Sequence, residues 1–204
     1  MHAGTSCCRL FLPYGRQHAS RSQRASAGGG GMRPLAYATP EQLIAWAAAM
    51  MERAPDFVIG PADAPYLRRW WVIPRNEACN VYLHEILRSD DDRALHDHPW
   101  ANTSMLLDGR YVEHTPDGSF MRGAGWVGSR EATAAHRLEI LPGERALSLF
   151  ITGPKVREWG FICPQGWTHW RDFTGGEHGE LVGRGCGEHD ALLPFTSAVE
   201  AQLA

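Results

Sequence analysis

Three histidines in this chain have the spacing of a metal site. His96 and His98 are separated by one residue at the start of an apolar, strand-like run, and His136 opens a second apolar alternation further along the chain. In an extended segment, residues i and i+2 point to the same face, so His96 and His98 would aim together while Asp97 faces away. We therefore expect the three imidazoles to meet around one divalent metal ion if the chain folds back between them.

The segment between these histidines contains the turn that such folding requires. Thr115-Pro116-Asp117-Gly118 is made of residues that favour tight turns, and it separates two short runs, 110–114 and 120–122. The sequence predicts a hairpin here, which would bring His136 back beside His96 and His98.

The predicted ligand set favours iron chemistry. Imidazole binds Fe, Zn, Cu, Ni and Mn alike, so the ligands alone do not choose the metal. Three neutral ligands on one face leave the ion its full charge and open coordination positions, which favours an anionic chelating substrate together with oxygen. Fe(II) is the metal we expect first, and Zn, Mn and Ni stay open.

The spacing of these residues resembles the first signature of the cupin superfamily. After His96-x-His98 come three residues, Asn102, six residues and Gly109, which fits that signature with asparagine in place of its glutamate. Only the histidine of the second cupin signature is present, as His136. Three histidines without a carboxylate are similar to the pattern of thiol dioxygenases such as the cysteine dioxygenases. The resemblance implies a jelly-roll barrel with a metal at His96, His98 and His136, and Asn102 becomes our candidate for an outer partner of a ligating histidine.

One further stretch is similar to the same family. Ser148 stands where thiol dioxygenases carry the first residue of a Ser-x-His-x-Tyr relay, but Phe150 and Thr152 replace the other two. Cysteine itself is therefore not the substrate that this chain predicts.

Four other residues are candidates for substrate binding and catalysis. Arg88 and Arg157 have the planar donor groups that hold a carboxylate in two places. His84 and His169 are the candidates for a general base. Within 80–88, His84 and Arg88 share one face, so both approach the metal only if that face lines the barrel.

The pattern of the whole chain predicts a mainly β fold, a jelly-roll barrel with an N-terminal helix. Thr39, Pro40 and Gln42 form a helix start with a capping box, and Pro55 should end that helix near Arg53. The predicted strands are short, rich in aromatic and branched residues, and separated by Gly and Pro turns: 66–73, 80–88, 146–152, 157–163 and 167–170.

Composition limits the remaining possibilities. A chain of 204 residues with eight Trp normally forms one core. We expect a disordered extension at 1–31 that need not belong to the native protein, a helical segment at 32–65, and the barrel with a loop-rich tail at 66–204. A net charge of −3 and the absence of a long apolar run argue against nucleic-acid and membrane partners and favour a cytoplasmic protein with a small-molecule substrate. A homodimer stays open.

The five cysteines form no CxxC pair, so we expect reduced thiols, with Cys163 the best candidate for a reactive one.

Three functional hypotheses follow. The first is a metal-dependent cupin enzyme, a mononuclear Fe(II) dioxygenase acting on a small carboxylate- or thiol-bearing molecule. The second is a non-catalytic cupin that binds or senses a small molecule. The third is a cupin-type sugar isomerase or epimerase, which needs a general base in the cavity.

Overall fold

The computed structural model describes residues 38–90, 94–174 and 183–187. The extension expected at 1–31 and the apolar tail near the C-terminus lie outside these residues. The elements in chain order are α1 (Pro40–Met51), β1 (Phe57–Ile59), β2 (Leu67–Trp71), β3 (Asn80–Ile86), β4 (Leu95–His96), β5 (Asn102–Thr115), β6 (Gly118–Gly123), β7 (Val127–Arg130), β8 (Arg137–Glu139), β9 (Ala146–Thr152), β10 (Gly160–Cys163), β11 (Gly166–His169) and α2 (Trp170–Thr174).

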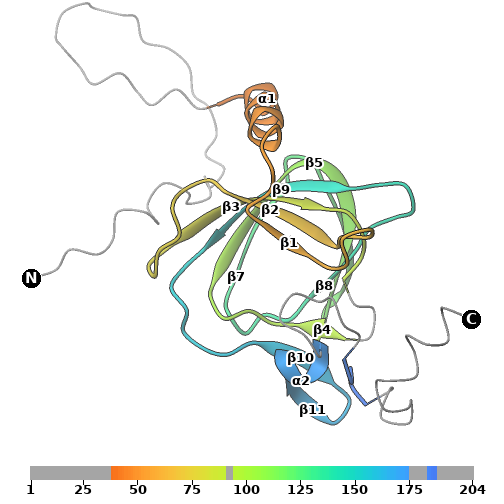
Figure 1. Ribbon diagram of the computed structural model, residues 1–204. Helices are drawn as coiled ribbons and strands as arrows, with labels where there is room; N and C mark the ends of the chain where they lie inside the picture. The colour runs from red at the N-terminus through yellow and green to blue at the C-terminus, as the bar shows by residue number, and fades with distance from the viewer. Residues whose placement is uncertain (1–37, 91–93, 175–182, 188–204) are drawn as a thin grey trace, which may run out of the picture.

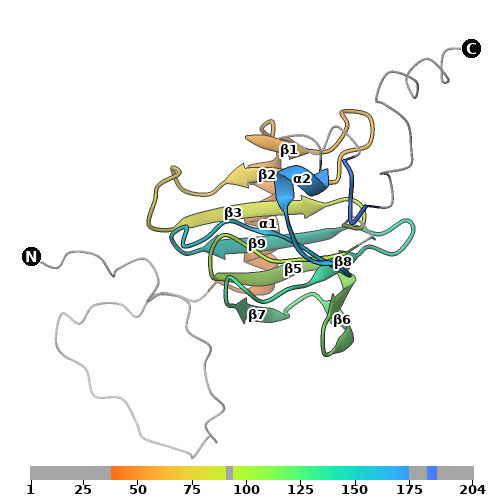
Figure 2. The ribbon, with the colours of Figure 1, turned by 90° about the horizontal axis from the view of Figure 1, so that it is seen from below.

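The strands form two antiparallel sheets. The larger sheet has the order β1-β2-β3-β9-β5-β6, and β7 and β8 also pair with β5. The smaller sheet has the order β11-β10-β4. The larger sheet curls, and the smaller sheet and α2 lie at the end opposite α1 (Figure 1). Seen from below, β1, β2, β3, β9, β5 and β7 follow one another as neighbours (Figure 2). The mainly β, barrel-like fold with an N-terminal helix is confirmed.

The N-terminal helix α1 begins where the sequence predicts. Thr39 accepts a hydrogen bond from the backbone of Gln42, and the Gln42 side chain accepts one from the backbone of Thr39, which satisfies two donors at the helix start. The fully buried Ala47 packs with the outward side chains of the sheet, among them Leu83 and Leu149. Helix α1 thus covers one face of the larger sheet and leaves the other face free to line a cavity.

Strand β5 changes its inward-facing positions half-way along its length. Its register with β9 shifts between Leu106 and Asp108, so one additional residue lies on β5. Before the shift the even-numbered Ser104 lines the cavity, and after it the odd-numbered Tyr111 does, so the inward-facing side chains change from even to odd positions. Gly109 follows the shift with φ of 76°, and a Cβ there would lie 2.0 Å from the carbonyl oxygen of Arg145. Only glycine fits this conformation and this close approach.

The predicted hairpin is present, because β5 pairs with β6 from Arg110↔Gly123 to Thr115↔Gly118. The apolar alternation that His136 opens is present as β8. The short strands β1 and β7 and the helix α2 were not predicted, since segments of three to five residues give too little periodicity. Among the described residues, no helix is long and apolar enough to span a membrane.

A disulfide corrects one expectation from the sequence. Cys163 at the end of β10 is bonded to Cys186, so neither is a reduced thiol, and Cys163 is not a reactive one. Cys79 is buried and forms no disulfide with another described cysteine. The sequence misled here because nothing in a 23-residue separation shows that two cysteines meet after folding.

Candidate metal centre

The three histidines of the expected site lie together at the end of the barrel. His96 ends β4, His98 follows two residues later, and His136 directly precedes β8. One potential ligand atom from each side chain lies within 4.8 Å of the other two. Ring centroids are 5.0 Å apart for His96 and His136, 5.0 Å for His98 and His136, and 5.1 Å for His96 and His98.

Backbone pairing holds these histidines in place. His96 and His136 form an antiparallel bridge, with N···O distances of 2.8 and 2.9 Å in the two directions. The backbone N–H of His98 donates to Ala132 at 3.0 Å. The segments that carry the histidines are thus joined as a short sheet, and the site does not depend on free loops.

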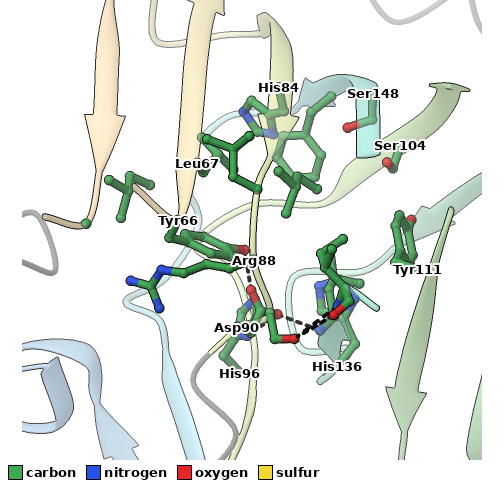
Figure 3. Close-up of a pocket in the computed structure, with 18 of the residues that line it drawn as sticks. Tyr66, Leu67, His84, Arg88, Asp90, His96, Ser104, Tyr111, His136 and Ser148 are labelled. Carbon is green, nitrogen blue, oxygen red and sulfur yellow. Dashed lines mark hydrogen bonds and ion pairs between the residues drawn. The ribbon is translucent and has the colours of Figure 1, made fainter. Parts of the chain in front are cut away.

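The triad opens onto a large cavity of about 920 Å³. Its walls are largely aromatic and aliphatic, with a few charged side chains among them. In Figure 3, His96 and His136 lie at one end of this cavity, whereas His84 and Ser148 lie at the other. A small molecule bound in the cavity would therefore reach both the triad and the residues at the far end.

The environment keeps His96 and His98 uncharged at neutral pH. Burial, only partly offset by Asp90, lowers the pKa of His96 to about 4. Burial and the neighbouring His96 and His136 hold the pKa of His98 well below its usual value of 6.5. Neutral imidazoles are the form that binds metal ions, so these ligands need not lose protons first.

His136 is oriented by a buried carboxylate. Its Nδ1 lies 3.0 Å from Oε1 of Glu113, a side chain only 2% exposed. Arg122 Nε donates to the same carboxylate at 2.9 Å, and Arg130 donates a further hydrogen bond. Burial alone would raise the pKa of Glu113, but its hydrogen bond with His136 and the charge of Arg130 lower it to about 2. The ionised carboxylate keeps the proton of His136 on Nδ1 and leaves Nε2 free as a ligand.

His96 has a second carboxylate behind it. Its Nδ1 lies 3.6 Å from Oδ2 of Asp90, and that oxygen accepts a hydrogen bond from the backbone N–H of Leu138 at 2.6 Å. The hydroxyl of Tyr66 donates to the other oxygen of Asp90 (Figure 3). Burial and the charge of Asp90 raise the pKa of Tyr66 well above 10, so its phenol is protonated at neutral pH.

Asp97 faces away from the triad, as the alternation predicts, and joins it to the smaller sheet. It is 2% exposed and accepts hydrogen bonds from Gly160 N at 2.8 Å and Trp167 Nε1 at 3.0 Å. Arg157 donates a third one. The segment that carries His96 and His98 is thus tied to β10 and β11.

This set of donors fits a divalent metal ion. Three imidazoles converge, two of them have carboxylates on the side away from the triad, and the group contains no thiolate. Outer carboxylates that orient ligating histidines are usual in metal sites. The ligand types suit Fe, Zn, Ni, Cu and Mn and do not choose among them.

The structure places two of the other predicted residues at the cavity and two away from it. His84 and Arg88 line it, so the even-numbered face of 80–88 is the inner one. Arg157 is paired with Asp97, and His169 lies 3.4 Å from Glu158 on the surface; neither is among the residues that line the cavity. The aromatic side chains near them do reach the site, because Trp159 and Phe161 contact His96 with ring centroids 6.2 and 5.9 Å away.

Asn102 is buried on the inner face of β5, and it does not contact the triad through a hydrogen bond. Neither Oδ1 nor Nδ2 of its amide has a hydrogen-bond partner in the described part of the chain. Asn102 can therefore act as an outer partner of a ligating histidine only through a molecule that lies between the two side chains.

Sequence reasoning missed the residue that dominates the far end of the cavity. Arg69 Nε donates to Nε2 of His84 at 2.8 Å, and its guanidinium lies 4.7 Å from the ring centroid of Tyr82. No acidic side chain among the described residues forms an ion pair with Arg69. Burial, and then the charge of Arg69, hold the pKa of His84 well below 6.5. His84 is thus a neutral acceptor from Arg69, which places its proton on Nδ1.

No protein-family model and no curated protein matches the sequence. Solved structures with a similar fold include the polyketide cyclase RemF from Streptomyces resistomycificus, at 14% identity over 55% of this chain and 81% of that one, with a TM-score of 0.44. A sugar phosphate isomerase from a cupin superfamily, from Silicibacter pomeroyi DSS-3, is 13% identical over 47% of this chain and 65% of that one, with a TM-score of 0.40. A cupin-2 domain containing protein from Shewanella frigidimarina NCIMB 400 is 13% identical over 42% of this chain and 78% of that one, with a TM-score of 0.36.

Proposed function

We propose that this protein is a metal-dependent oxidoreductase, a mononuclear Fe(II) dioxygenase that acts on a small carboxylate-bearing molecule. The observation that carries the proposal is the triad of imidazoles, with His96 and His98 uncharged, at the end of a largely apolar cavity. His96, His98 and His136 would hold the ion. When bound, Fe(II) would supply open coordination positions and the one-electron chemistry that dioxygen requires.

Arg69 is the side chain that supports an anionic substrate. The guanidinium of Arg69 is half-buried and has no carboxylate partner among the described residues, which is unfavourable because a charge withdrawn from water is normally paired. A substrate carboxylate would supply the missing partner and accept two parallel hydrogen bonds from the guanidinium. Arg69 lies on the inner face of β2 beside His84, at the end of the cavity opposite the triad. The substrate would thus place its carboxylate near Arg69 and its reacting end near the histidines.

The walls of the cavity would keep water from the reacting end. His98 stacks on Trp100, with ring centroids 5.5 Å apart, and Phe150 lies 6.1 Å from His98. Trp159 contacts His96 edge to face at 6.2 Å. Apolar surroundings strengthen the electrostatic interactions inside such a site.

The test is oxygen consumption by protein reconstituted anaerobically with Fe(II) and supplied with a panel of small carboxylates and small thiols. We expect uptake that depends on iron and on one member of the panel, and its loss in His136→Ala. Arg69→Gln should lower kcat/KM about 10- to 100-fold, since it removes charged hydrogen bonds to the substrate. Arg68→Gln is the matched control, because Arg68 lies next in sequence on the opposite face and pairs with Glu85.

Two results would contradict the proposal. If the protein retains no iron after anaerobic reconstitution, the metal site is wrong. If iron binds but no oxygen is consumed, while a panel member raises the melting temperature, the non-catalytic binding hypothesis takes its place.

One observation favours a second candidate, a metal-dependent isomerase or lyase. Tyr66 presents a protonated phenol to the cavity next to the triad, hydrogen-bonded to Asp90, and such a pair suits proton transfer to a substrate. Here the predicted base, His84, is held by Arg69 and is the weaker candidate. Turnover without oxygen, lost in Tyr66→Phe, would select this candidate over the dioxygenase.

A further inference from the structure

Three polar side chains stand side by side on adjacent strands next to the triad. Asn102 on β5 is opposite Thr152 on β9 and opposite Arg130 on β7. Directly opposed residues in an antiparallel pair project from the same face. That face is the inner one, because Arg130 lines the cavity, and so does Ser104, which lies two residues after Asn102. Figure 3 shows Ser104 at the cavity.

These side chains carry buried polar atoms that lack a partner. Within the described part of the chain, five buried side-chain atoms have no hydrogen bond: Oδ1 and Nδ2 of Asn102, Oγ1 of Thr152, Nη1 of Arg130 and Nδ1 of His98. His98 belongs to the same cluster, since its backbone donates to Ala132, two residues after Arg130. The strand pairings thus put Asn102, Thr152 and Arg130 at adjacent positions of the sheet, and the backbone bond of His98 places this histidine at the same end of the barrel.

Such a cluster requires a partner that the protein does not supply. Buried polar groups in folded proteins are nearly always hydrogen-bonded, and a concentration of exceptions indicates an ordered ligand. Here Asn102 and Thr152 are 4% and 1% exposed, so the partner must be very small.

The mixture of donors and acceptors identifies water as that partner. Arg130 offers a donor and Asn102 a donor and an acceptor, while the hydroxyl of Thr152 serves as either. An anion could not satisfy the acceptor of Asn102, and the charge of Arg130 is already met by Glu113. Buried water commonly bridges about three groups of this kind.

We infer that ordered water enclosed by Asn102, Thr152 and Arg130 bridges to Nδ1 of His98 and orients this histidine for metal binding. His136 and His96 have Glu113 and Asp90 behind them, whereas no carboxylate among the described residues pairs with His98. Water that accepts the Nδ1 proton of His98 would leave Nε2 as its ligand atom, matching His136. Asn102 and Thr152 are thus positioning residues that act through water. The role in metal binding rests on the proposed metal site, whereas the water site does not.

Thr152→Val gives the sharpest test, because it replaces a hydroxyl by a methyl group of the same shape. If the hydroxyl holds water, the metal-free protein should melt about 2–4 °C lower. Affinity for Zn(II), measured against a competing chelator, should fall about tenfold. A higher melting temperature with unchanged zinc affinity would overturn the inference, because removal of an unsatisfied hydroxyl should stabilise the core.

Substitutions of Asn102 separate positioning from packing. Asn102→Leu should weaken zinc binding about 10- to 100-fold, and Asn102→Asp, which keeps an acceptor for water, should restore at least the wild-type affinity. The ring-nitrogen NMR signals of His98 in the metal-free protein should show the Nδ1-protonated tautomer in the wild type and a mixture in Asn102→Leu. Equal zinc affinities and equal ring signals in these two variants would refute the role.

A matched control lies one position away. Thr103 is on the outer face of β5, where its hydroxyl pairs with Ser129 at 2.8 Å, so Thr103→Val should leave zinc affinity and the His98 signals unchanged. If the wild type binds no zinc, the metal site is refuted, and the melting temperature of Thr152→Val and the tautomer of His98 still decide the water site.

Discussion

The substitution Glu113→Gln tests how the outer partner of His136 supports the site. Glu113 is almost fully buried and accepts hydrogen bonds from His136, Arg122 and Arg130. Glutamine has nearly the same shape but no charge, and one of its two polar ends is an N–H donor. The amide N–H₂ of the glutamine would replace one carboxylate oxygen and would then point at a hydrogen-bond donor of His136, Arg122 or Arg130.

The size of the effect follows from these contacts. Removal of one partner from a buried ion pair typically costs 3–5 kcal/mol. Since glutamine retains one acceptor oxygen and Arg122 is partly exposed, we expect about 3 kcal/mol, or a melting temperature lowered by roughly 6–12 °C. Loss of an outer partner of a ligating histidine usually weakens metal binding 10- to 100-fold, and we expect a change in that range.

The two effects need separate assays. Chemical denaturation of the metal-free protein gives the free energy of unfolding, and zinc competition with a chelator gives the affinity. Glu139→Gln is the matched control, because Glu139 also accepts a hydrogen bond from a histidine, His114 at 2.7 Å, but at a partly exposed position away from the triad. We expect this variant to change stability by less than about 1 kcal/mol and to leave zinc affinity unchanged.

The reasoning would be refuted by a Glu113→Gln protein that unfolds at the wild-type denaturant concentration and binds zinc equally well. Equal effects of Glu113→Gln and Glu139→Gln would also refute it, because burial and contact with a ligand are the features that distinguish the two sites.

Three further predictions concern pH, the disulfide and a close backbone approach. The pKa of His96 is lowered from 6.5 to about 4 in the folded state, so the unfolded chain binds more protons than the folded one between these two pH values. The metal-free protein should therefore lose about 3 kcal/mol of stability from this group as the pH falls from 6.5 to 4. A free energy of unfolding that stays constant over this interval in denaturant titrations would contradict the burial of a neutral His96. Cys163→Ser removes the disulfide to Cys186 and should lower the free energy of unfolding by roughly 3 kcal/mol relative to the wild type. The wild type measured with and without reductant is the control, and a wild type whose stability does not change with reductant would show that the disulfide is not formed. Gly160→Ala would place a Cβ 2.1 Å from the carbonyl oxygen of Thr168, so we expect thermal unfolding to show a free energy of unfolding lower by about 2 kcal/mol or more. An unchanged melting temperature would mean that β10 and β11 pair differently.

The metal ligands were accessible from the sequence because local rules place them. Spacing by two residues aims His96 and His98 together, and the turn at Thr115 to Gly118 folds the chain back toward His136. The predicted continuous strand after His96 was wrong in one respect, since β4 ends there and β5 begins at Asn102. The bridge between His96 and His136 replaces the ladder that a longer strand would have supplied.

The partners of these ligands were not accessible in the same way. Glu113 lies eleven positions after Asn102, so alternation by two places it on the opposite face, and only the register shift at Leu106 to Asp108 turns it inward. Arg69 and Asp90 look like ordinary surface charges in the sequence. Their burial follows from strand pairings between distant segments, and local pattern carries no signal for it.

The register shift in β5 also constrains how this protein can vary. Asn102 and Glu113 face the same interior only because the stretch between them contains one residue more than regular alternation allows. Insertion or deletion of a single residue between Ser104 and Tyr111 would rotate Glu113 to the outside, whatever amino acids are present. Variants that keep the chain length from Asn102 to Glu113 can exchange many side chains and preserve the site, while a change of one in that length removes the carboxylate behind His136. Chain length in this stretch is therefore as much a determinant of the metal centre as the histidines themselves.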